Sequence, residues 1–166
     1  MIGDLKDKAV LVCGCGNILF GDDGFGPEVA KRLVENYDLP PEVLVLDVGT
    51  GIREILFDLA VNEQRPLRLI IVDAVEHQGR QPGEVFDIAV DDIAPQKTAD
   101  FSLHQFPTVN ILKELQDLTS MEVHILVAQV EDIPEAVRPG LSAPVQAAVE
   151  VAGQRLAALL GGVRKV

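Results

Sequence analysis

Short apolar runs alternate with longer amphipathic stretches along the chain. The apolar runs are rich in Val, Ile and Leu and end at glycine or polar residues, which is typical of buried strands. They cover residues 9–13, 43–47, 67–73, 84–88 and 122–128. The amphipathic stretches repeat apolar residues at the three- and four-residue spacing of a helix, and they cover residues 27–35, 52–59, 104–118 and 142–160. This alternation predicts an α/β fold, a three-layer α/β/α sandwich whose mostly parallel sheet of about five strands carries helices on both faces.

Less regular segments mark the boundaries of these elements. Gly161 and Gly162 follow the last amphipathic stretch, where a helix would end. Residues 91–102 are polar, contain Pro95 and show no sustained period, so we expect a surface loop there. The apolar run 84–88 is short, and this strand could lie at an edge of the sheet.

Composition limits the classes of partner. The 166 residues are 48% hydrophobic, which predicts a single domain over residues 1–166. The net charge of −12 disfavours nucleic acid and anionic membranes, because phosphate groups repel an acidic surface, and favours a protein or small-molecule partner. No secretory leader or apolar run of about 20 residues is present, so we expect a cytoplasmic protein. Cys13 and Cys15 are too close in sequence to staple a fold, which fits a reducing compartment.

Acidic side chains follow three of the predicted strands. Asp23 lies in the loop after the first strand, Asp47 closes the second and Asp73 closes the third, while His104 lies near the start of a helix. Ligands of such sheets bind beyond the carboxyl ends of the strands, where the strand order reverses. Two carboxylates and an imidazole there are an oxygen and nitrogen ligand set for a borderline divalent metal such as nickel or zinc. Each residue also has a structural alternative: Asp23 and Asp73 as helix caps or turn formers, and His104 as a capping or partly buried histidine.

The glycine-rich loop after the first strand also permits other interpretations. Gly14, Gly16 and Gly21 suggest a dinucleotide site, but the third glycine comes five residues after the second, and Asp22 and Asp23 occupy the helix start where a phosphate would bind. We instead expect the glycines to give a tight exit from the strand and room for a substrate segment. Asp22 is expected to shape the turn or cap the helix.

The other reactive side chains have simpler interpretations. Cys13 and Cys15 could form a thiolate site, although two small buried side chains are the commoner outcome. His77 and His124 are expected to be ordinary surface or strand residues. The chain has no His-Glu-x-x-His helix, Gly-x-Ser-x-Gly elbow or Gly-Lys-Ser/Thr phosphate loop, which disfavours ordinary metalloproteases, serine hydrolases and P-loop enzymes.

Several motifs in their order along the chain resemble one family, the nickel–iron hydrogenase maturation endopeptidases. GCGNIL at 14–19 and DDGFG at 22–26 resemble the family signature after the first strand. The similar motifs that follow are DVGT at 47–50, IVDA at 71–74, SLHQ at 102–105 and GLS at 140–142. Val48 departs from the glycine of the family turn, and Cys15 stands where an aliphatic residue is expected. The first loop is most similar to the subgroup that serves deazaflavin-reducing hydrogenases of methanogens.

The resemblance implies a function and a site. Members remove a C-terminal extension from the hydrogenase large-subunit precursor, after a His or Arg, and their metal-contacting residues correspond to Asp23, Asp73 and His104. These residues are expected to serve both recognition and catalysis. The resemblance implies that the nickel belongs to the substrate and that the enzyme has no essential metal of its own. We expect a monomer that attacks the peptide bond with water, and its acidic surface would suit a precursor with a basic tail or rim. The alternative is a noncatalytic nickel chaperone for hydrogenase assembly.

Overall fold

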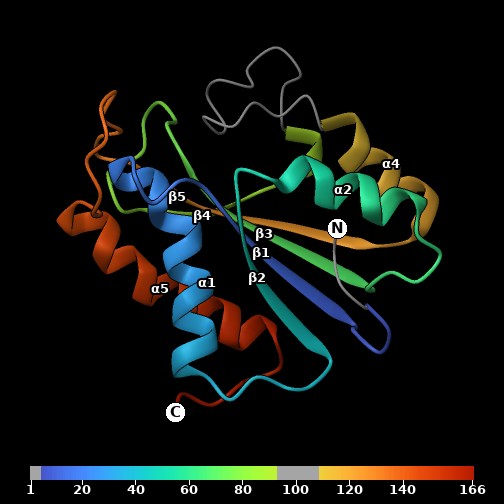
Figure 1. The fold of residues 1–166 in the computed structure, drawn as a ribbon. Coiled ribbons are helices and arrows are strands. Elements are labelled where there is room, and N and C mark those ends of the chain that lie inside the picture. Colours follow the sequence, from blue (N-terminus) through green and yellow to red (C-terminus); the bar gives the residue numbers. More distant parts are fainter. Residues whose placement is uncertain (1–4, 93–108) are drawn as a thin grey trace.

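The computed structural model describes residues 5–92 and 109–166, and within these ranges five strands form one sheet in the order β2-β1-β3-β5-β4 (Figure 1). The strands are β1 (Val10–Cys15), β2 (Val43–Gly49), β3 (Arg68–Val75), β4 (Val85–Ile88) and β5 (Glu122–Gln129). Neighbouring strands are parallel except β4, which pairs with β5 antiparallel at the edge. The expected edge position of this short strand is therefore confirmed.

Helices cover both faces of the sheet. They are α1 (Phe25–Asn36), α2 (Ile52–Val61), α4 (Val109–Thr119) and α5 (Ala143–Leu159), with short 3₁₀ helices η1 (Gly21–Gly24) and η2 (Val90–Asp92). The helices α1 and α5 lie on one face, and α2 and α4 on the other (Figure 1). This arrangement confirms the predicted three-layer α/β/α sandwich with a mostly parallel sheet. The predicted surface loop at 91–102 and the helix start at 104 fall largely outside the described residues.

The core has two halves because successive strand residues point to opposite faces. In β3, Leu69 and Ile71 pack toward α2 and α4, whereas Ile70 and Val72 pack toward α1 and α5. All four side chains are fully buried. Burying each such side chain stabilises the fold by about 1.5–3 kcal/mol. The continuous apolar run that predicted β3 is thus explained by helices on both of its sides.

Four strands extend further than the sequence pattern indicated, and β1 and β5 do so by two residues and one residue, to Cys15 and Gln129. β2 continues two residues beyond Asp47, and β3 continues two residues beyond Asp73, which pairs with Val127 of β5. The expectation that these acids close their strands was therefore wrong in detail. Backbone pairing with a neighbouring strand continues past the exposed Asp47 and the buried Asp73 alike, because the ladder uses main-chain groups whatever the side chain is.

Glycines bring the backbone of α1 against that of the sheet. A Cβ atom on Gly14 would lie 2.3 Å from the carbonyl oxygen of Gly26, and one on Gly26 would lie 2.1 Å from that of Cys15 and 2.5 Å from that of Val72. A Cβ atom on Gly16 would lie 1.9 Å from the carbonyl oxygen of Asp23. The room beside these glycines is therefore filled by the chain's own η1 and α1, and the expectation that it admits a substrate segment was wrong.

Among residues 5–92 and 109–166, none of the helices combines the length and the apolar character needed to cross a bilayer.

Candidate functional site

Two buried carboxylates lie where the strand order reverses. From β1 the chain crosses through α1 to β2 on one side, while β3 pairs with β1 on the other side, so the switch point lies between β1 and β3. Asp23 in η1 is 2% exposed, and Asp73 in β3 is 0% exposed. The register pairs Gly14 of β1 with Val72, the residue before Asp73. The structure thus places both predicted acids at the crevice position of the fold.

Backbone amides hold these two carboxylates. The Asn17 N–H donates to Asp23 Oδ2 at 2.9 Å, and the Ala74 N–H donates to Asp73 Oδ1 at 2.8 Å. Buried charged groups are stable only when they are paired, hydrogen-bonded or bound to a metal. Both acids are therefore held in fixed positions by the loop and strand that carry them.

The pKa of the Cys15 thiol is shifted by burial and by the acidic residues around it. Burial raises its pKa well above the usual value, and the negative charges of Asp73, Asp47 and Asp23 raise it further. Burial alone raises the pKa of Cys13 to about 12. Both thiols therefore remain protonated at neutral pH, and they pack in the core below α2 and α4. The interpretation of the cysteines as small buried side chains is confirmed, and their raised pKa values disfavour a thiolate at either position.

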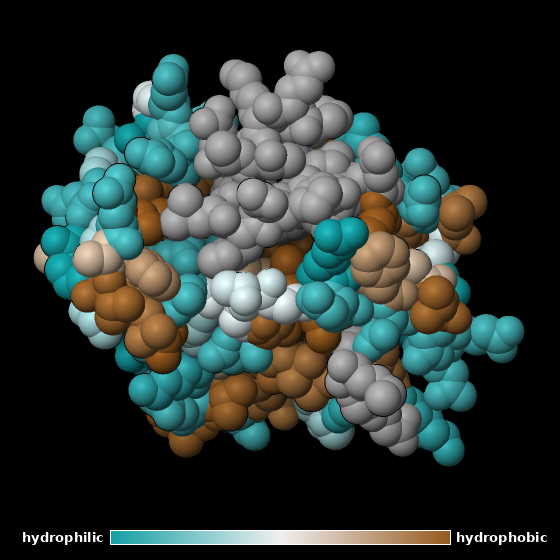
Figure 2. Space-filling model, turned by 45° about the horizontal axis from the view of Figure 1, so that its top comes forward, coloured by the Kyte–Doolittle hydropathy of each residue, from teal (hydrophilic) through white to brown (hydrophobic). Residues whose placement is uncertain are grey.

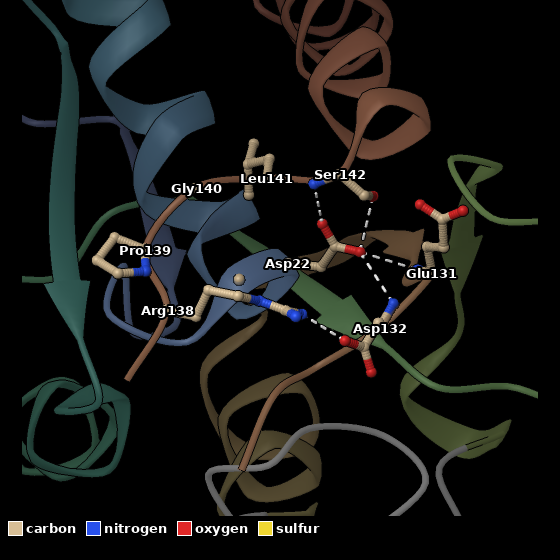
Figure 3. Close-up of a pocket in the computed structure, with 9 residues that line it drawn as sticks. Asp22, Glu131, Asp132, Arg138, Pro139, Gly140, Leu141 and Ser142 are labelled. Atoms are coloured by element: carbon tan, nitrogen blue, oxygen red, sulfur yellow. Dashed lines mark hydrogen bonds and ion pairs between the residues drawn. The ribbon is translucent and has the colours of Figure 1, made fainter. Parts of the chain in front are cut away.

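The Asp22 carboxylate binds a different segment of the chain from the one that the Asp23 carboxylate binds. Asp22 is 1% exposed, and its carboxylate accepts four hydrogen bonds from the segment between β5 and α5 (Figure 3). The donors are the Glu131 N–H at 2.9 Å, the Asp132 N–H at 3.2 Å, the Ser142 N–H at 2.7 Å and the Ser142 hydroxyl at 2.9 Å. No side-chain capping bond is present at the start of η1 or α1, and the bonds of Asp22 run to a distant segment instead of its own turn, a role that the sequence did not indicate.

A cavity of about 430 Å³ adjoins this carboxylate (Figure 3). It is lined by residues 21–22, 131–132 and 138–142, and the Arg138 guanidinium crosses it to pair with Asp132. Residues 131–139 carry no motif that predicts a role for them. Their only signal was the proximity of the GLS motif at 140–142, whose Ser142 bonds Asp22.

The remaining histidines behave as expected. His124 lies in β5 and its Nε2 is 2.6 Å from Glu122 Oε1, while the His77 ring meets the Phe86 ring edge-on with centroids 6.1 Å apart. His104, the third predicted site residue, lies outside the described residues. Across the two described ranges, no group of three or more His, Cys, Asp or Glu side chains is arranged to hold a metal ion. The ligand set of Asp23, Asp73 and His104 therefore stays a prediction.

The fold and the buried acids define a doubly wound α/β protein with a polar site at its switch point, and comparisons give its family. The family model for hydrogenase maturation protease matches residues 27–158. The coenzyme F420 hydrogenase subunit delta of Methanothermobacter thermautotrophicus is 36% identical over 90% of this chain and 93% of its own. The hydrogenase 2 maturation protease of Escherichia coli is 31% identical over 91% of this chain and 90% of its own.

A solved structure agrees with these relatives. The hydrogenase maturating endopeptidase HybD from Escherichia coli superposes with a TM-score of 0.71 at 31% identity, over 95% of this chain and 96% of its own. The chain belongs to the hydrogenase maturation protease family, and it is a peptidase.

Proposed function

We propose that this protein removes the C-terminal extension of the large-subunit precursor of a nickel–iron hydrogenase after nickel has been installed there. The observation that carries the proposal is the pair of buried carboxylates, Asp23 in η1 and Asp73 in β3, at the switch point between β1 and β3. The match to a coenzyme F420 hydrogenase subunit supports a deazaflavin-reducing hydrogenase as the source of the precursor. The protein acts in this proposal as a cytoplasmic monomer.

Nickel is part of the substrate in this proposal, and the enzyme has no essential metal of its own. Asp23 and Asp73 supply oxygen ligands, and His104 supplies a nitrogen ligand, a set that suits nickel. Without nickel in the precursor, the two carboxylates repel one another, and no metal fixes the peptide bond beside them. With nickel, the same groups bind the precursor and fix the peptide bond for attack.

Hydrolysis then proceeds by attack of water on the carbonyl carbon of the peptide bond. A carboxylate assists by taking up a proton from the water, or the nickel of the substrate assists by lowering the pKa of the water. The nickel can also polarise the carbonyl. The carbon–nitrogen bond breaks, and the amine of the released peptide leaves with a proton. Asp23 and Asp73 suit such a task because backbone amides hold them in place, so little reorganisation is needed.

The test compares purified nickel-loaded and nickel-free precursor by mass spectrometry after incubation with the enzyme. Loss of a C-terminal peptide from the loaded form alone is expected. Asp23→Asn and Asp73→Asn retain side-chain shape but remove a charge, and each is expected to lower the cleavage rate at least about a hundredfold. Asp87→Asn is the matched control, because Asp87 is an exposed carboxylate on β4, and it is expected to cleave at the normal rate.

The outcomes separate the alternatives. Equal cleavage of both precursor forms would remove nickel from the recognition step. Normal cleavage by either asparagine variant would remove that residue from the site. Tight stoichiometric binding of free nickel with no cleavage of any precursor would instead support the noncatalytic chaperone.

A further inference from the structure

Two large apolar side chains are exposed on the loop between β1 and η1. Ile18 is 52% exposed and Leu19 is 44% exposed. The loop itself is hydrogen-bonded, because the Leu19 N–H donates to Asn17 Oδ1 at 3.0 Å and the Phe20 N–H donates to the Asn17 carbonyl at 3.1 Å. The backbone therefore holds these side chains at the surface. Clustered apolar side chains at such a position mark an interaction site.

A second loop brings further apolar side chains to the same place. Val137 is 63% exposed, and the next residue, Arg138, donates its N–H to the Leu19 carbonyl at 2.8 Å. Ile18 and Leu141 also adjoin each other, since side-chain carbons of both lie within 4 Å of the position a Cβ atom would take on Gly24. We call Ile18, Leu19, Val137 and Leu141 the apolar rim.

Figure 2 brings the top of Figure 1 forward, and a brown group lies on its left, on the side where η1 and the 131–142 segment lie in Figure 1. The two loops are fastened to each other by the Asp22 carboxylate, which bonds both ends of the second loop (Figure 3). The apolar rim is thus a preformed surface, which costs little ordering entropy when a partner binds.

The apolar rim is connected directly to the proposed site. Asn17, which anchors the Ile18–Leu19 tip through its side chain, also donates its backbone N–H to Asp23 Oδ2 at 2.9 Å. One residue therefore holds both the exposed tip and a carboxylate of the site. A protein bound on the apolar rim would lie beside Asp23.

The charges around the apolar rim indicate which kind of partner would bind there. Glu131, Asp132 and Glu135 are exposed on the second loop, against the single cation of Arg138, and the whole chain carries −12. A second copy of this chain would bring like charges together, and an anionic membrane would be repelled. A protein with an apolar patch flanked by basic side chains is complementary.

We infer that the apolar rim is the docking surface for the folded body of the precursor, which presents an apolar patch flanked by basic residues. The inference rests on the proposed function, because the precursor is the occupant. Docking there would supply affinity away from the peptide bond, so that chemistry is left to the buried acids.

The test measures KM and kcat on nickel-loaded precursor for Ile18→Ser/Leu19→Ser and for Val137→Ser. KM is expected to rise about tenfold for the double variant, with kcat changed less than about twofold, since truncating apolar contacts at an interface weakens binding. Val61→Ser and Leu118→Ser are matched controls, because both side chains are 80% exposed elsewhere, and their KM is expected to stay normal. Unchanged melting temperatures would show that the variants fold.

A charge variant supplies a second measurement. Glu135→Lys is expected to raise KM at low salt, and the difference from wild type should shrink in high salt, where charges are screened. Normal KM in all rim variants, with wild type cleaving, would overturn the docking surface while leaving the proposed function intact. So would a wild-type dimer that the rim variants dissociate. Absence of cleavage by wild type would instead count against the proposed function itself.

Discussion

Replacing Asp22 by asparagine tests the idea that one buried carboxylate fastens the two loops beside the site. The amide keeps the volume of the side chain but turns one acceptor oxygen into a donor. If the nitrogen replaces Oδ1, it faces the Ser142 N–H; if it replaces Oδ2, it faces the N–H groups of Glu131 and Asp132. In either orientation at least one partly buried donor loses its acceptor.

The expected cost follows from those contacts. A buried donor without an acceptor costs about 1–3 kcal/mol, and the bonds that remain become neutral where they had been charge-assisted, at about 0.5–1 kcal/mol each. Asp22→Asn should therefore lower the free energy of unfolding by about 3–5 kcal/mol. Since domains are stable by about 5–15 kcal/mol, the variant should still fold.

Urea unfolding followed by circular dichroism measures this difference. Asp132→Asn is the control, because this exposed carboxylate makes only a surface pair with Arg138, and its loss should cost less than about 1 kcal/mol. Hydrogen exchange should quicken at the Glu131 and Ser142 amides of the Asp22 variant. A loss of stability no larger than that of the control would refute the reasoning that Asp22 joins the loops.

Two further predictions concern the backbone contact and the thiols. Gly26→Ala should destabilise the protein by at least about 3 kcal/mol, because the new methyl group would overlap main-chain atoms. Gly79→Ala is the control: its methyl group would meet open space, and its φ of 81° should cost only about 1–2 kcal/mol. Thermal unfolding of both variants measures the difference. The pKa of Cys13 is about 12 in the folded protein and 9.0 in the unfolded chain. Below about pH 9 the thiol is protonated in both states, so it does not change the free energy of unfolding with pH. Between pH 9 and 12 the unfolded chain alone loses the proton, and the free energy of unfolding should fall by about 1.4 kcal/mol per pH unit. Urea unfolding from pH 8 to 10.5 should show a shallower decline in Cys13→Ala, and an identical slope would contradict the pKa shift. Both Cys13 and Cys15 should react with a thiol reagent only after unfolding, and labelling of the native protein at neutral pH would refute their burial.

The architecture could be predicted from the sequence because its signal is local. Buried strands need continuous apolar runs, and covering helices need a 3.6-residue period, so both kinds of element are visible within a short window. The rule that parallel strands bring their carboxyl ends to one edge also pointed to the edge at which Asp23 and Asp73 lie, but the sequence alone could not prove that the two side chains converge. The same rule could not give the side-chain geometry or the role of His104, which lies outside the described residues.

Contacts between distant segments could not be predicted in this way. Asp22 and Ser142 are 120 residues apart, and neither residue has a local pattern that identifies the other as its partner. The prediction that the glycines leave room for a substrate segment failed for a similar reason. A glycine shows that something approaches the backbone closely, but it does not show whether that is a ligand or, as at Gly14, the chain's own helix.

The glycine contact between β1 and α1 has a consequence for how the site tolerates change. Gly26 of α1 lies close to main-chain atoms of Cys15 in β1 and of Val72 in β3. Asp23 precedes Gly26 by three positions, and Asp73 directly follows Val72. The spacing of the two carboxylates is thus set by peptide groups, whose dimensions are the same in every sequence. A change in the volume of a core side chain should therefore shift the two carboxylates less than a substitution of Gly14 or Gly26, which would force these main-chain segments apart.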